Sequence, residues 1–158
     1  MDLRVDSAHQ TAEHAFDSGL YCAESVVRAL ARAQGEESEL LTRIATGFCS
    51  GMARTCGPCG ALSGGIIGIG LALGRAQAGE PVQSAYSAVQ TFIGDFEHAF
   101  GARNCDALLG CDLGTAEGQA IFRERRLHER CREFTARAAE LAAGAIARHA
   151  AVERALTA

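Results

Sequence analysis

The chain has 158 residues, 48% of them hydrophobic, which is the size of one domain that can bury a core without cross-links. Its net charge of −4 comes with 15 arginines and no lysine, and this acidic balance argues against a nucleic-acid partner. The first residues lack the apolar segment of a signal peptide, and the longest apolar run, residues 61–73, is shorter than the ~20 residues that span a bilayer. These features predict a single domain over residues 1–158, a cytoplasmic location and no membrane span.

Apolar residues recur at helical spacing along the chain, and no window alternates as a strand does. A first stripe runs from Phe16 to Leu30 and is interrupted by Gly19, and a second apolar face covers residues 40–48. Residues 47–60 are rich in glycine and cysteine and predict a functional loop. That loop leads into a glycine-rich helix from about Ala61 to Ala76.

The second half of the chain continues the helical pattern. Pro81 suits the first turn of a helix whose buried stripe includes Tyr86 and which ends at Gly101. Asn104 is an N-cap candidate for a short helix, and one long helix is expected from about Thr115 to the C-terminus. The predicted fold class is therefore all-α, a single-domain helical bundle with a Gly/Cys-rich loop leading into a glycine-rich helix.

Three glycines, Gly60, Gly64 and Gly68, are four residues apart and share one face of the glycine-rich helix. A face without side chains lets another backbone or a bound cofactor come unusually close. Tight helix packing explains this pattern, and Gly60 and Gly64 can also leave room for a cofactor or a partner thiol beside Cys59. The same apolar, glycine-rich helix is compatible with a homodimer.

The most distinctive motif is Cys56-Gly57-Pro58-Cys59, in which Pro58 stiffens the loop and Cys59 begins the next helix. Unpaired amides and the helix dipole at such a position favour a thiolate and lower its pKa. Cys56 and Cys59 are therefore candidate catalytic residues of a dithiol. The thioredoxin fold is excluded because its CGPC follows a strand, and none is expected here. A c-type haem site is excluded because Gly60 stands where a histidine is needed. A zinc site built from two CxxC pairs is excluded because the chain has no second CxxC.

The other five cysteines give weaker signals one by one. Cys105 lies at a helix start, which would activate it, and Cys131 lies on a core stripe with arginines nearby that could stabilise a thiolate. Cys22 taken alone is a core residue. Cys49 and Cys111 are accessory thiols or have no role.

Four local sequences together resemble a known family. Their cysteines are Cys22 in GLYCAES, Cys59 in the CGAxxG element Cys59–Gly64, Cys105 in NCDALLG, and Cys131. In this order they resemble the C-GCAxxG-C-C family of redox-active proteins, over nearly everything from Gly19 to Cys131. The chain departs from that pattern by adding Cys49, Cys56 and Cys111.

The resemblance implies a redox function without a defined reaction, and it extends to the iron–sulfur part of split-Soret cytochromes. The first hypothesis is therefore an electron carrier or sensor that meets a redox partner protein. In it, a [2Fe–2S] or [4Fe–4S] cluster is held by the usual number of four thiolates. The ligands would be Cys22, Cys59, Cys105 and Cys131.

Two alternatives stay open at this stage. Cys56 and Cys59 could exchange disulfides with a partner protein or a small thiol, with Cys105 or Cys22 as a relay. Zinc or another soft metal could instead be held for structure or trafficking, with His128 as a nitrogen ligand one turn before Cys131. We favour the metal–sulfur centre because four dispersed cysteines are more than a dithiol needs. An oxidoreductase activity is compatible with the first two hypotheses.

Overall fold

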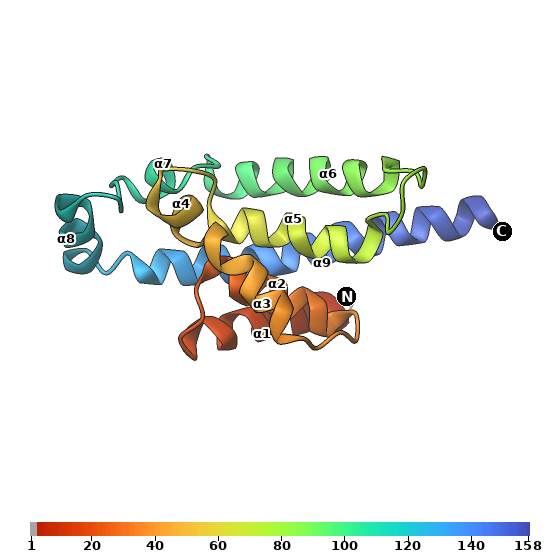
Figure 1. Cartoon of the computed structure of the whole chain (residues 1–158), viewed down its shortest axis with the longest axis horizontal. Helices are drawn as coiled ribbons and strands as arrows, with labels where there is room; N and C mark the ends of the chain where they lie inside the picture. Colours follow the sequence, from red (N-terminus) through yellow and green to blue (C-terminus); the bar gives the residue numbers. More distant parts are fainter. Residues whose placement is uncertain (1–2) are drawn as a thin grey trace.

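The computed structural model describes residues 3–158, and these residues form helices and connecting loops with no strand. Helices α5, α6 and α9 run along the long axis, α1, α2 and α3 cover one side, and α4, α7 and α8 gather at one end (Figure 1). The all-α prediction is confirmed. The bounds are α1 Leu3–Asp17, α2 Cys22–Ala33, α3 Glu39–Ala45, the 3-10 turn η1 Thr46–Phe48, α4 Cys49–Arg54, α5 Gly60–Leu73, α6 Gln83–Phe100, α7 Cys105–Leu109, α8 Ala116–Glu124 and α9 His128–Thr157.

The glycine face of α5 packs directly on α2. A Cβ atom on Gly64 would lie 2.8 Å from the carbonyl oxygen of Ala23, and one on Gly68 would lie 2.2 Å from Cδ1 of Leu30. Neither distance leaves room for a methyl group, so the helices can approach this closely only because these positions are glycine. The prediction of tight helix packing at this face is confirmed.

Helix α6 buries most of the expected stripe, since Phe96 is in the core and Val89, Ile93 and Phe100 pack against it, but Tyr86 does not belong to that stripe. Tyr86 is 58% exposed, whereas Phe92 and Phe96 are fully buried. The buried positions Ala88, Phe92 and Phe96 are four residues apart, and Tyr86 lies about 200° around the helix from Ala88, on its far side. Pro81 also precedes the helix, which begins at Gln83.

The long C-terminal helix expected from Thr115 is two helices, α8 and α9. Arg126 between them has a left-handed φ of 53°. The Leu127 N–H donates to the carbonyl of Phe122 at 3.0 Å, and the Arg126 N–H donates to that of Arg123 at 3.2 Å, which is the hydrogen-bond pattern that commonly ends a helix at a glycine. An arginine in that conformation carries no sequence signal for a stop, so the apolar spacing suggested one continuous helix.

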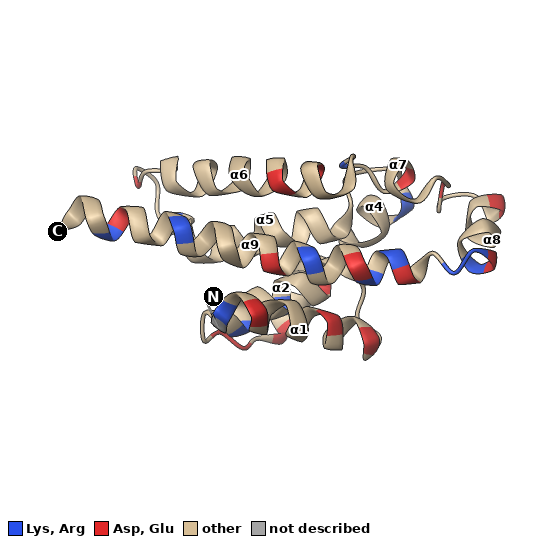
Figure 2. Ribbon diagram, turned by 180° about the vertical axis from the view of Figure 1, so that it is seen from behind, with Lys and Arg blue, Asp and Glu red and all other residues tan. Residues whose placement is uncertain are grey.

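Charge is distributed unevenly over the helices. Charged side chains lie on α1, α8 and α9, whereas α5 has none and α6 has few (Figure 2). Even so, no helix among residues 3–158 combines the length and the apolar character needed to cross a membrane.

Candidate functional site

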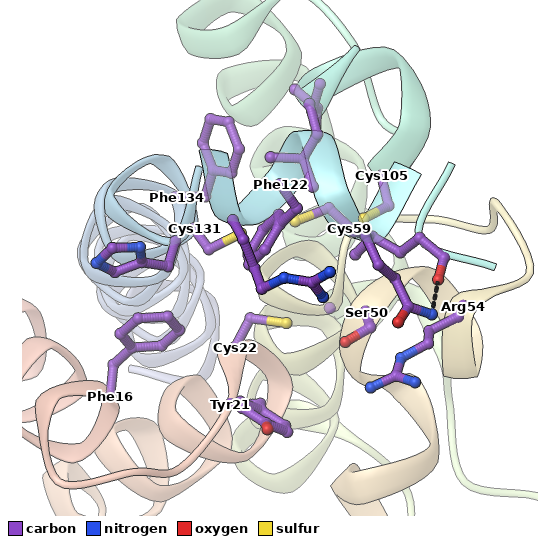
Figure 3. Close-up of a pocket in the computed structure, with 17 residues that line it drawn as sticks. Phe16, Tyr21, Cys22, Ser50, Arg54, Cys59, Cys105, Phe122, Cys131 and Phe134 are labelled. Atoms are coloured by element: carbon purple, nitrogen blue, oxygen red, sulfur yellow. Dashed lines mark hydrogen bonds between the residues drawn. The ribbon is translucent and has the colours of Figure 1, made fainter. Parts of the chain in front are cut away.

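Four cysteines from four different helices line one cavity of about 230 Å³ at the end of the bundle. Cys22, Cys59 and Cys105 are buried, and Cys131 is half-buried. Figure 3 shows their side chains reaching the same space from different sides. Residues as far apart in the chain as Cys22 and Cys131 thus line a common site.

Each of these cysteines lies where a helix begins. They are the first residue of α2 (Cys22), the N-cap of α5 (Cys59), the first residue of α7 (Cys105) and a first-turn residue of α9 (Cys131). The amides of a first helical turn have no partner within the helix, so they can donate to sulfur. At Cys59 the N–H groups of Ala61 and Leu62 do so. At α9, by contrast, the amides of Arg130 and Cys131 already donate to the carbonyl of Leu127. Helix starts of this kind favour negative charge near the cavity.

Backbone pairing brings Cys59 and Cys105 together. The Cys59 N–H donates to the carbonyl of Arg103 at 2.7 Å, and the Cys105 N–H donates to that of Gly57 at 2.9 Å. The two segments form an isolated antiparallel bridge between Pro58 and Asn104. The rigid loop predicted from the CGPC motif therefore anchors α7 beside α5.

Part of the remaining wall is formed by α4, which is a left-handed turn. Residues 50–53 have φ between 57° and 66°, and Arg54 follows with φ 67°. L-residues resist this conformation by roughly 1–2 kcal/mol each. At Gly51 the absent side chain matters for space as well, because a Cβ there would lie 2.5 Å from Cβ of Cys105. The turn therefore packs tightly on α7 and directs Ser50 and Arg54 to the cavity.

Gly60 clears space at the cavity floor. A Cβ on this residue would lie 2.4 Å from Sγ of Cys22 and 2.9 Å from the carbonyl oxygen of Phe48. Gly64, the other glycine expected near the cofactor, faces α2 and is absent from the cavity lining. Of the two glycines, only Gly60 is thus next to the thiols.

Burial holds the thiols of Cys59, Cys105 and Cys131 in the neutral form. It raises the pKa of Cys105 to about 11 and those of Cys59 and Cys131 to about 12. Two amide hydrogen bonds at Cys59 and the charge of Arg130 at Cys131 act in the opposite direction but are weaker. The expectation that helix starts and arginines lower these pKa values is therefore wrong for the metal-free protein, because desolvation dominates.

The three additional cysteines are placed differently. The Cys56 thiol is hydrogen-bonded to the Asp112 carboxylate, which raises its pKa, and Cys56 does not line the cavity. The Cys49 thiol donates to the carbonyl of Ala45 at 3.8 Å and also interacts with the Cys22 thiol, and Cys49 does not line the cavity. Cys111 is buried, and it lies close enough to Cys105 to raise the pKa of the Cys105 thiol.

The cavity rim contains residues that the sequence did not single out. Arg54 and Arg123 line it together with His128, which had been considered as a metal ligand. Their spacing in the chain carries no motif, and only Arg54 lies in the loop predicted to be functional. Among residues 3–158, no three His, Cys, Asp or Glu side chains are grouped so that they could hold a single metal ion.

Comparison with known proteins gives one match. The model of a family described as "Putative redox-active protein (C_GCAxxG_C_C)" matches residues 20–145. This segment includes all four cysteines that line the cavity. No curated protein and no solved structure matches the chain.

Proposed function

The chain belongs to the C-GCAxxG-C-C family of redox-active proteins, and from this premise we propose that its four-thiol cavity binds an iron–sulfur cluster. The observation that carries this proposal is that Cys22, Cys59, Cys105 and Cys131 all line one cavity. Four thiolates are the usual ligand set of both [2Fe–2S] and [4Fe–4S] clusters. The protein would then act as an electron carrier or sensor that meets a redox partner.

The size of the cavity supports a cluster over a single ion. A tetrahedral zinc ion keeps each thiolate sulfur at about 2.3 Å, so its four ligands must crowd around one point. In this chain the four thiols line a cavity of about 230 Å³, which has room for more than one atom.

The surrounding residues are suited to hold such a group. The amides of Ala61 and Leu62 donate to Cys59, and hydrogen bonds to sulfur are one means by which a protein sets a cluster potential. The side chains of Phe16 and Phe134 form an apolar part of the cavity wall, which limits the access of water to the thiols. A bound iron–sulfur cluster supplies one-electron transfer. The half-buried Cys131 marks the side from which an electron would reach a partner.

The test begins with protein purified without oxygen. We expect broad visible absorbance and equal amounts of iron and acid-labile sulfide. Single Cys→Ser changes at the four cavity positions should each reduce the iron content severely. Cys56→Ser is the matched control, because Cys56 belongs to the same CGPC segment but lies outside the cavity.

The variants separate the cluster from the dithiol alternative. A metal-free, colourless protein whose thiol exchange depends on both Cys56 and Cys59 would overturn the cluster proposal and favour the dithiol. Loss of iron in Cys56→Ser, with full retention in Cys105→Ser, would show that the ligand set is wrong. Wild-type iron content in Cys56→Ser together with loss in the other four variants supports the proposal.

A further inference from the structure

The outer part of the cavity has a composition that the four thiols do not explain. Its rim carries the exposed side chains of Tyr21, Arg54, Arg123 and His128, and the half-buried Ser50 adds a hydroxyl group. Among the described residues 3–158, no aspartate or glutamate lines the cavity, although the chain has 19 acidic residues and a net charge of −4. The rim therefore offers hydrogen-bond donors and positive charge in a protein that is acidic as a whole.

Neither arginine of the rim is neutralised by the protein. Within residues 3–158, the guanidinium groups of Arg54 and Arg123 have no ion-pair partner and no hydrogen bond. At least six of the other thirteen arginines have acidic partners. These are Arg32, Arg103, Arg126, Arg132, Arg137 and Arg148.

The two arginines also arrive from different elements. Arg54 ends the left-handed turn α4, and Arg123 lies in the last turn of α8, so neither is a neighbour of the other in the chain. The unusual backbone of α4 directs Arg54 to the cavity at a conformational cost. Two guanidinium groups beside a pocket are suited to clamp a carboxylate or another oxyanion, because each presents a planar pair of donors.

We propose that the rim between Arg54 and Arg123 binds a small anion, carrying a carboxylate or another oxyanion group, against the thiol floor of the cavity. The inference deepens the proposed function, since the anion would lie beside the cluster. The rim itself is made of polypeptide alone. It can therefore be tested in the metal-free protein.

Two alkylating reagents of similar size probe the rim. Iodoacetate is an anion and iodoacetamide is neutral, and the same thiolate attacks either reagent, forming an S–C bond as iodide leaves. The ratio of the two rates at one cysteine therefore cancels the thiolate fraction of that cysteine. Cys131 is the reporter because it is the most exposed of the four cavity thiols, and peptide mass spectrometry gives its rates separately from those of the other thiols. Its raised pKa slows its reaction with both reagents to the same extent, so the ratio of the two rates is unaffected.

The expected result is a high preference for the anion at Cys131. The iodoacetate-to-iodoacetamide ratio should exceed that of free glutathione. It should fall about three- to tenfold in Arg54→Gln and in Arg123→Gln, as removal of one nearby charge in a largely hydrated site predicts. Arg75→Gln is the control, because Arg75 is equally exposed and lies outside the cavity.

A second measurement distinguishes a binding site from a general positive field. Oxalate and phosphate should protect Cys131 from the neutral iodoacetamide with a saturating concentration dependence in wild-type protein and much more weakly in the two variants. Unchanged rate ratios in the variants, or protection that follows ionic strength without saturating, would overturn the proposal.

Loading with iron and sulfide separates this proposal from the previous one. Arg54→Gln and Arg123→Gln should load as fully as wild type. If both variants lose the cluster, the arginines only balance its charge, so the anion site is refuted and the proposed function stands. If wild-type protein never loads but the anions still protect Cys131, the proposed function fails and the anion site stands.

Discussion

The substitution Gly60→Ala tests whether the space at the cavity floor is essential. The new Cβ would lie 2.4 Å from Sγ of Cys22, 2.9 Å from the carbonyl of Phe48 and 3.1 Å from Cα of Cys49. The sulfur can rotate away, but the two backbone atoms cannot, so α5 must shift relative to η1 and α4. Such overpacking costs about 1–3 kcal/mol. The gain from replacing glycine in a helix is at most about 1 kcal/mol.

We therefore expect Gly60→Ala to lower the free energy of unfolding and to reduce cluster content sharply, because relief of the clash displaces Cys22. Gly70→Ala is the matched control in the same helix. A Cβ on Gly70 would contact nothing within 4 Å, so this change should raise stability by up to about 1 kcal/mol and leave the cluster intact. Urea unfolding of the metal-free proteins gives the first quantity, and iron and sulfide assays after reconstitution give the second.

One result would refute this reasoning. If Gly60→Ala gained stability as Gly70→Ala does and also loaded a full cluster, the close contact between α5, Cys22 and η1 would not constrain the site. Loss of stability with full loading would be equally informative, because it would assign the glycine to helix packing and remove it from the cofactor site.

Two further predictions concern the core and the buried thiols. Phe92→Ala should cost about 3–5 kcal/mol in urea unfolding, because this ring is fully buried between α5 and α6, whereas Tyr86→Ala at an exposed site should change stability by less than about 0.5 kcal/mol. Equal effects of the two changes would contradict the observed register of α6. Because burial raises the pKa of Cys59 from 9.0 to about 12, its neutral form stabilises the fold fully below pH 9, and this contribution is lost as the pH rises towards 12. The free energy of unfolding of the metal-free protein should therefore fall between pH 9 and 11, and it should fall less in Cys59→Ala. An identical pH dependence in both proteins would refute the burial of this thiol.

Most helices could be predicted because their signals are local. The apolar spacing, Gly19 between α1 and α2, and the stop at Gly101 all act within a few residues. The break at Arg126 could not be predicted, since nothing in its side chain favours a positive φ and the surrounding tertiary structure imposes it. The same applies to the left-handed turn α4, where Gly51 is the only residue suited to that conformation.

The family resemblance singled out Cys22, Cys59, Cys105 and Cys131, and these four residues line one cavity. Spacing alone could not give this grouping, because contact between Cys22 and the floor at Gly60 depends on how α2 packs against α5. The electrostatic expectation failed for a related reason. The pKa of a thiol at a helix start depends on burial as well as on the dipole, and burial cannot be read from one cysteine in a sequence.

The raised pKa values bear on the choice between dithiol chemistry and metal binding. A thiol with a pKa near 12 is ionised in roughly one molecule in 10⁵ at pH 7, so Cys59 is a poor nucleophile for disulfide exchange in the metal-free protein. An iron ion that bound the sulfur would replace its proton. The metal–sulfur bond would then offset the free-energy cost of ionising the buried thiol. The amides at the helix starts, too weak to ionise a thiol by themselves, become favourable partners once the sulfur is anionic. Thiols with pKa values raised in this way, together with the amide donors at Cys59, are thus weakly reactive without a metal and would be well suited to bind one.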